Sequence, residues 1–185
     1  TEALLIVHNT LVATNLREDI AIGAAGKITS AFNIARTLAL GADWCNAARG
    51  YMFALGCIQA LNCHTGRCPS GVATQDPRRG NKLDVAHESQ RVFNYHKNTL
   101  DALQNLLEAA GLRHPSELGP EHVIRRTSKT EVHSYLDLYP FLEPGALLTG
   151  EKTGRTVFDK YWPEARANTF EPPHFIMKLR ETKLR

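Results

Sequence analysis

The chain has 185 residues, 43% of them hydrophobic and 22% charged, which is typical of a globular protein and excludes disordered and collagen-like chains. Its formal net charge is only +3 and its basic residues are spread along the chain, so we expect no nucleic-acid partner. The sequence contains no apolar run of about 18 residues and no signal-peptide pattern, so we expect a cytoplasmic protein without a membrane span.

Alternating helices and strands are predicted for the first third of the chain. Residues 3–12 predict a helix whose apolar face carries Leu4, Val7, His8, Leu11 and Val12. The short apolar run 20–26 predicts a buried strand that opens into a glycine loop. Either Thr29 or Ser30 is expected to cap the following helix, which continues to Leu40.

A second strand is predicted at residues 42–47, followed by a helix that continues to about Gln59. The order strand, helix, strand favours two parallel strands of an α/β sheet or barrel. A complete (β/α)8 barrel takes about 250 residues, so two strands make only part of one. We therefore expect the chain to be the last portion of a larger α/β domain.

The rest of the chain predicts a long loop, one long helix and an irregular tail. Periodicity is absent from residue 57 to residue 81, and long ordered loops are usually functional. A helix over residues 86–110 is indicated by apolar positions at helical spacing: Val92, His96, Leu100, Leu103, Leu107 and Ala110. A short helical element begins at His114, and only weak signals follow Thr127.

Three of the four cysteines lie in the loop, at Cys57, Cys63 and Cys68, with His64 among them. Thiolates are soft ligands that favour iron–sulfur clusters, zinc or copper(I). The three thiolates could hold a cluster that needs three protein ligands, or could form a Cys3His zinc site with His64. They could equally be free thiols that pack as small apolar residues. The spacing leaves these readings open, whereas Cys45 is expected in the core.

The two predicted strands are each followed by small residues. Gly23, Gly26 and Lys27 belong to the first strand and its loop, and Ala47, Ala48, Arg49 and Gly50 follow the second. If the strands are adjacent, both loops leave the same edge and lead into helix N-termini, which favour anions. In barrels, the last two such loops commonly bind phosphate. Ordinary turn chemistry is the alternative, and Lys27 would then face solvent.

The segment GCIQALNCHTGRCPSGVATQD, residues 56–76, resembles the part of glutamate synthases that binds a three-iron cluster. GADWCNAARGYMFALGC resembles the last strand and helix of their FMN-binding domain, and GAAGKITSAFNIARTLALGAD resembles the loop and helix before it. The similarity is closest to compact members without an amidotransferase domain, whose tails also carry a stretch like SYLDLYPFLEPGALL.

This resemblance implies that residues 1–120 are the carboxyl-terminal part of an FMN-binding TIM barrel, and that residues 121–185 are an extension. It implies that Cys57, Cys63 and Cys68 bind a 3Fe-4S cluster, and that Gly26 and residues 46–49 contact the FMN phosphate. Asn46, Ala48 and Arg49 replace the glycines and threonine of better-known members, and GAAG replaces Asp-Gly-Gly. The Arg49 side chain is therefore expected to help bind the phosphate.

The implied reaction is the reduction, at the flavin, of an imine formed from 2-oxoglutarate and ammonia, which yields glutamate. The implied partners are 2-oxoglutarate, ammonia or glutamine, and an electron donor that is ferredoxin or a reductase subunit. The catalytic groups of the family lie on earlier strands, so no catalytic residue is assigned here. We expect the chain alone to be inactive and to self-associate. The alternative is a non-catalytic zinc-binding, electron-transfer or scaffold module that uses the same cysteines.

Overall fold

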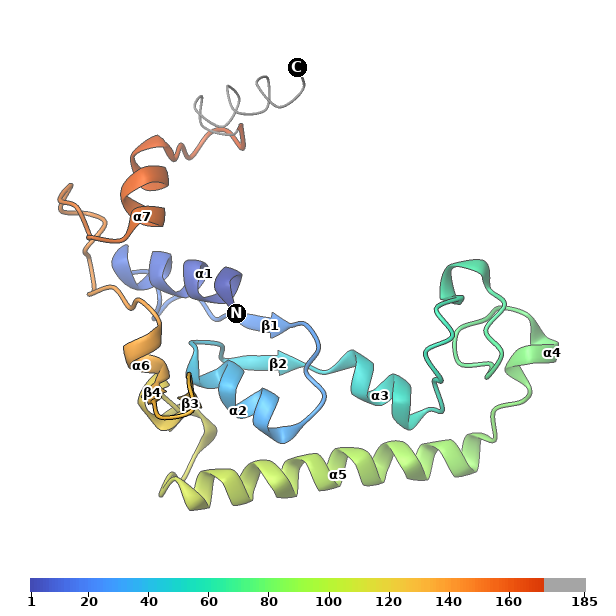
Figure 1. Cartoon of the computed structure of the whole chain (residues 1–185). Helices are drawn as coiled ribbons and strands as arrows, with labels where there is room; N and C mark the ends of the chain where they lie inside the picture. The colour runs from blue at the N-terminus through green and yellow to red at the C-terminus, as the bar shows by residue number, and fades with distance from the viewer. Residues whose placement is uncertain (172–185) are drawn as a thin grey trace. The chain divides into compact units, whose positions relative to one another are not determined.

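The computed structural model describes residues 1–171, which divide into two compact units (Figure 1). The first unit comprises residues 1–8 and 21–139, and the second comprises residues 9–20 and 140–171. Helix α1 (Glu2–Ala13) supplies residues to both. No helix among the described residues is long and apolar enough to cross a membrane.

A pair of parallel strands lies in the first unit (Figure 1). Strand β1 (Gly23–Ala25) pairs with β2 (Trp44–Asn46), so that Ala25 is opposite Asn46 at the carboxyl end. Helix α2 (Ala31–Ala39) connects them, and the Ser30 hydroxyl caps it by accepting the backbone N–H of Asn33. The prediction of two adjacent parallel strands joined by a helix is therefore confirmed, but the expected burial of residues 20–26 is wrong, since only Ile22 among them is buried.

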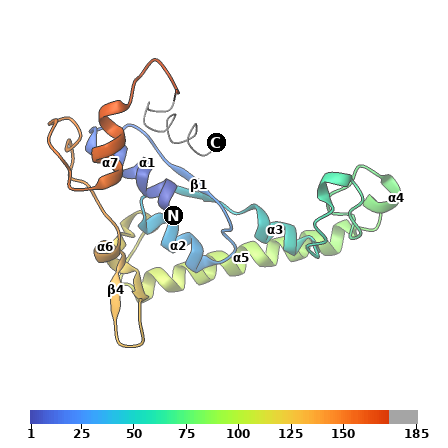
Figure 2. The same ribbon diagram turned by 45° about the horizontal axis from the view of Figure 1, so that its top comes forward.

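The core of this unit forms where α2 packs on α5 (Val85–Ala109), which runs alongside α2 and α3 in both views (Figures 1 and 2). Its buried residues are Ala31, Ala35, Leu103 and Leu107. The predicted extent of the long helix is confirmed, but Leu100 is 48% exposed. Burial follows the crossing with α2 rather than the whole apolar stripe, because a helix side chain is buried only where another element covers it.

Helix α3 (Ala48–Ala54) is shorter than the sequence predicted. It ends at Ala54 with Leu55 as its C-cap, and Gly56 follows with a φ of +86°, a conformation that glycine adopts at helix ends without a steric penalty. The loop after it contains only a 3-10 turn, η1 (Cys63–Thr65), and the one-turn helix α4 (Pro77–Gly80). The expectation of a long loop is confirmed.

The expectation of an irregular tail is confirmed only in part: residues 139–155 contain no helix or strand, but short elements lie on both sides of them, and residues 172–185 lie outside the described residues. A β-hairpin joins β3 (Ile124–Arg126) to β4 (Val132–Ser134), and α6 (Tyr135–Leu138) follows directly. Two 3-10 turns, η2 (Pro115–Glu117) and η3 (Pro120–His122), precede the hairpin. Its strands are three residues long and almost wholly exposed, so they lack the alternation of apolar and polar residues that identifies strands in a sequence.

The second unit has its own small core. Ala13, Leu147 and Phe158 are its buried residues, and Phe158 belongs to α7 (Thr156–Tyr161), which continues into η4 (Trp162–Glu164). The expected buried face of α1 is wrong: the buried residues are Leu5, Asn9 and Ala13, whereas Val7 is 48% exposed. A pattern built on hydrophobicity alone misses a face that is centred on an asparagine.

Candidate anion and cysteine sites

Two loops leave the same edge of the parallel strand pair. Gly26 and Lys27 follow β1, and Ala47 follows β2 as the N-cap of α3. Since Ala25 and Asn46 are paired, both loops start side by side. The structure thus brings together the two segments that the sequence predicted as one anion site.

The first loop has an unusual backbone. Gly26 has a φ of +129° and Lys27 has a φ of +55°, in the left-handed region. A residue other than glycine in this region costs of the order of 1 kcal/mol or more, and such residues cluster at functional sites. The conformation therefore supports a role for this loop beyond joining a strand to a helix.

Both loops carry an exposed cation. Lys27 and Arg49 are exposed, and within residues 1–171 neither side chain has a hydrogen bond or an ion pair. Ala48 is exposed and Ala47 is half-buried, so the backbone around Arg49 is also accessible. These cations are available for an anionic ligand.

Two of the predicted ligand-binding glycines, the exposed Gly23 and the buried Gly50, pack closely against aromatic side chains. A Cβ on Gly23 would lie 2.5 Å from atoms Cε2 and Cζ2 of the Trp44 indole. Gly50 is buried, and a Cβ there would collide with the Tyr95 hydroxyl. Their small size is therefore explained by neighbouring aromatic side chains.

An aromatic cluster that the sequence analysis missed lies beside the second loop. The Tyr95 ring, on α5, contacts Tyr51 of α3 edge-to-face, with 5.1 Å between ring centroids. The Tyr51 hydroxyl forms a hydrogen bond with Nδ1 of His96, and the Tyr95 hydroxyl donates to the Thr29 carbonyl at 3.1 Å. Burial, with a contribution from Tyr95, raises the pKa of Tyr51. No local pattern identifies the cluster, because its tyrosines lie on different helices.

The three loop cysteines line one pocket. Cys57 is half-buried, Cys63 is exposed and Cys68 is buried, and all three are free thiols. Apolar side chains supply most of the other walls: Met52, Ile58, Ala60, Leu61, Pro69, Val72 and Ala73. Three thiols at one apolar pocket form a soft donor set of the kind that iron–sulfur clusters require.

Hydrogen-bond donors surround the Cys68 sulfur. The Ser70 hydroxyl lies 3.4 Å from Sγ, and this hydrogen bond is the main cause that lowers the pKa of Cys68 to about 7. The backbone N–H groups of Ala73, Ser70 and Val72 contribute in the same direction. These groups favour the thiolate, which is the form that binds metal.

The described side chains do not form a site for a single metal ion. Among residues 1–171, no group of three histidine, cysteine or acidic side chains is close enough to hold one ion. His64 is exposed and does not line the pocket of the cysteines. The described residues therefore do not form the Cys3His zinc site, whereas a cluster with several irons can bind each thiolate at a different iron.

The cysteine loop is held in shape by its own polar contacts. The Thr74 hydroxyl donates to the Gly66 carbonyl at 2.5 Å, and the Asp76 carboxylate caps α4 at Arg78 N. Gly71 has a φ of +80°, and a Cβ there would collide with the Arg79 carbonyl oxygen. The position of Cys68 therefore depends on tight backbone packing three residues later.

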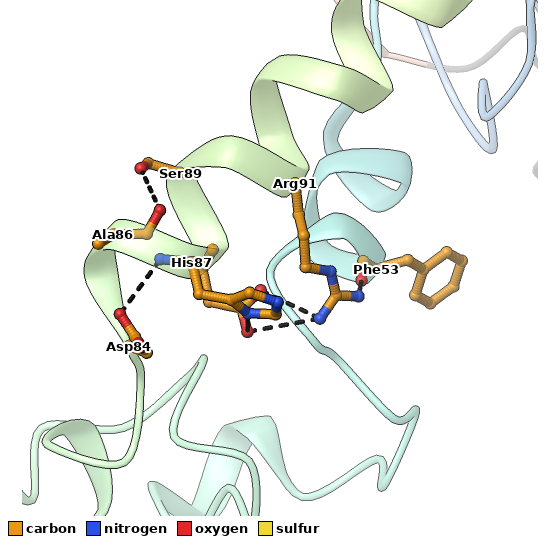
Figure 3. Close-up of polar contacts among 7 residues, drawn as sticks. Phe53, Asp84, Ala86, His87, Ser89 and Arg91 are labelled. Atoms are coloured by element: carbon orange, nitrogen blue, oxygen red, sulfur yellow. Dashed lines mark hydrogen bonds and ion pairs between the residues drawn. The ribbon is translucent and has the colours of Figure 1, made fainter.

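The start of the loop is tied to α5 (Figure 3). Arg91 reaches from α5 and donates to the Phe53 carbonyl at 3.4 Å, in the last turn of α3. Its guanidinium also pairs with the Glu88 carboxylate at 3.1 Å, and Asp84 caps the same helix at His87 N. Cys57 lies just after the end of α3, which the Arg91 side chain contacts.

Comparisons of the sequence with known proteins match the chain to one family. A family model described as "Conserved region in glutamate synthase" matches residues 1–113. The chain is 47% identical over 124 residues to the glutamate synthase large subunit-like protein YerD of Bacillus subtilis, covering 67% of this chain and 24% of that protein.

Two other relatives match a smaller part of this chain. The archaeal glutamate synthase (NADPH) of Methanocaldococcus jannaschii is 36% identical over 110 residues, covering 60% of this chain and 22% of that protein. The ferredoxin-dependent glutamate synthase 1 of Arabidopsis thaliana is 40% identical over 68 residues, covering 37% of this chain and 4% of that protein. The chain thus spans about a quarter or less of these relatives.

Proposed function

The chain belongs to the glutamate synthase family, and on this premise we propose that it is the carboxyl-terminal part of an FMN-binding synthase domain. In this proposal β1 and β2 are the last two strands of a (β/α)8 barrel, which agrees with their parallel pairing through α2. The other strands would come from sequence outside these residues, because the chain spans only part of its relatives.

We infer that Cys57, Cys63 and Cys68 hold a 3Fe-4S cluster. The observation that carries this inference is that all three are free thiols at one apolar pocket. Donors around the Cys68 sulfur favour its thiolate form. When bound, the cluster supplies one-electron transfer, and the protein's part is to hold three thiolates and to limit the access of water.

The two loops at the strand edge would bind the FMN phosphate. Lys27 and Arg49 would supply positive charge, while the backbone of Gly26, Ala47 and Ala48 would approach the phosphate closely. Gly23 and Gly50 would allow Trp44 and Tyr95 to pack closely beside the loops, because a side chain at either position would collide with these rings. The assignment is supported by two cations on adjacent loops whose side chains have no hydrogen bond or ion pair within residues 1–171.

The proposed activity of the longer protein is the reductive amination of 2-oxoglutarate to glutamate, with ammonia or glutamine as the nitrogen source. Some relatives are named as NADPH-dependent and one as ferredoxin-dependent, so the electron donor would be ferredoxin or a reductase subunit. A cytoplasmic location is part of the same proposal. The residues of this chain would hold both redox groups, and residues outside it would bind the substrate.

The test is the cofactor content of the full-length protein purified without oxygen. We expect a flavin spectrum with FMN released on denaturation, and about three irons with a similar amount of acid-labile sulfide per chain. Zinc without sulfide would favour the non-catalytic metal module. Iron and sulfide without flavin would favour an electron-transfer or scaffold protein, and either result would overturn the proposal.

A further inference from the structure

The Tyr95 hydroxyl lies between the two candidate phosphate loops. It donates to the carbonyl of Thr29, at the end of the loop after β1, and it contacts the α-carbon of Gly50, in the first turn after β2. One side chain from α5 thus touches both segments that leave the strand edge. We propose that Tyr95 is a positioning residue for the phosphate site, an inference that rests on the proposed function.

Gly50 makes this arrangement possible. It is buried, and a side chain at this position would occupy the place of the Tyr95 hydroxyl. Without that hydroxyl, the Thr29 carbonyl would lose its donor and the space beside Gly50 would be empty. Glycine at residue 50 and tyrosine at residue 95 are therefore two parts of one contact.

The Tyr95 ring is itself held in place. Its edge-to-face contact with Tyr51 fixes it against α3. The Tyr51 hydroxyl in turn forms a hydrogen bond with His96, which lies on α5 beside Tyr95. Further along α5, Leu103 and Leu107 pack in the core with α2. The position of the hydroxyl is thus set by helices that do not belong to the loops.

The part of FMN whose binding should depend on the Tyr95 contact is the phosphate. An anion site needs its donors and cations at a fixed separation, and Lys27 and Arg49 lie on the two loops that Tyr95 connects. Removing the hydroxyl leaves each loop intact but removes a direct link between them. Affinity for a phosphate that spans both loops should fall, while affinity for the flavin ring should not.

Riboflavin, which has the ring system of FMN but no phosphate, separates these two effects. The experiment measures the dissociation constants of FMN and riboflavin for the full-length apoprotein, as wild type and as Tyr95→Phe. We expect the preference for FMN over riboflavin to fall by about two- to tenfold in Tyr95→Phe, because one hydrogen bond is lost. Tyr139→Phe is the matched control, since it also removes one tyrosine hydroxyl, but from a ring that packs against Tyr135 at the end of α6, and its preference should not change.

The outcomes separate this inference from its premise. A wild-type protein that binds riboflavin as tightly as FMN has no phosphate site, which overturns the proposed function and the inference with it. A wild type that prefers FMN, with the same preference in Tyr95→Phe, overturns the inference alone. Equal losses for both ligands would show a general structural role and also overturn it. Gly50→Ala, which displaces the hydroxyl by steric contact, provides a second variant with the same expected change in preference.

Discussion

The Asn9 side chain is the hydrogen-bond partner of the Leu142 backbone N–H. Asn9 Oδ1 accepts the backbone N–H of Leu142 at 2.7 Å, and its Nδ2 donates to the Pro140 carbonyl at 2.9 Å. Asn9 is only 1% exposed, so both bonds are shielded from water. A buried amide is tolerated here because the backbone groups it meets would otherwise lack partners.

Asn9→Ala should lower the free energy of unfolding of the second unit by about 1–3 kcal/mol, since it leaves a partly buried N–H and a partly buried carbonyl without their partner. Asn98→Ala is the control, because Asn98 is exposed on α5 and alanine favours helix. Urea denaturation of the 185-residue chain measures both. Equal stability of Asn9→Ala and the wild type would contradict the structure.

Serine in place of any one of the three loop cysteines should remove iron and acid-labile sulfide from the full-length protein. The reason is that an alkoxide is a poor substitute for a soft thiolate ligand. Cys45→Ser serves as the control, because Cys45 is a half-buried residue of β2 outside the pocket. Full iron content in Cys63→Ser would show that Cys63 is not a ligand.

Gly71→Ala should disturb the cysteine loop more than Gly66→Ala does. Both residues have a positive φ, of +80° and +69°, but only a Cβ on Gly71 would meet a backbone atom, the Arg79 carbonyl oxygen. Backbone strain costs about 1–3 kcal/mol in either variant, and the collision adds to it at Gly71. Cluster retention on mild heating measures the difference, and equal retention in the two variants would argue against this packing.

Arg49→Ala should weaken FMN binding by about tenfold or more, because a charge-assisted hydrogen bond to phosphate contributes roughly 1.5–3 kcal/mol. Arg113→Ala removes another exposed cation, which lies beyond α5, and should leave the affinity unchanged. Fluorescence titration of the full-length apoprotein measures both. Wild-type affinity in Arg49→Ala would mean that backbone groups and Lys27 hold the phosphate without it.

The 185-residue chain by itself should form no glutamate and should self-associate. Its parallel sheet has only two strands, and large apolar side chains such as Phe32, Trp44 and Phe93 are about half exposed or more. Unpaired strand edges and exposed apolar groups favour association. Light scattering during gel filtration, beside a glutamate assay, tests this, and an active monomer would refute it.

Short-range signals in the sequence were sufficient for several features. Ser30 was one of two predicted caps of the first crossover helix, and the structure confirms it. The parallel strand pair followed from the alternation of short apolar runs with a helical segment, and the long helix followed from its apolar spacing. Such features depend on residues within about one turn or one strand of each other, so a linear pattern contains them.

Other features depend on partners far along the chain. The α1 face was mispredicted because Asn9 is buried by backbone groups more than 130 residues away, and no window around Asn9 includes them. The Tyr95 hydroxyl meets Thr29 across 66 residues and meets Gly50 only because α5 returns alongside α3. The cysteine spacing placed three thiols on one loop, but the folded loop decided that they share a pocket without His64. Burial and hydrogen-bond satisfaction are properties of the packed chain, so composition and periodicity could not specify these contacts.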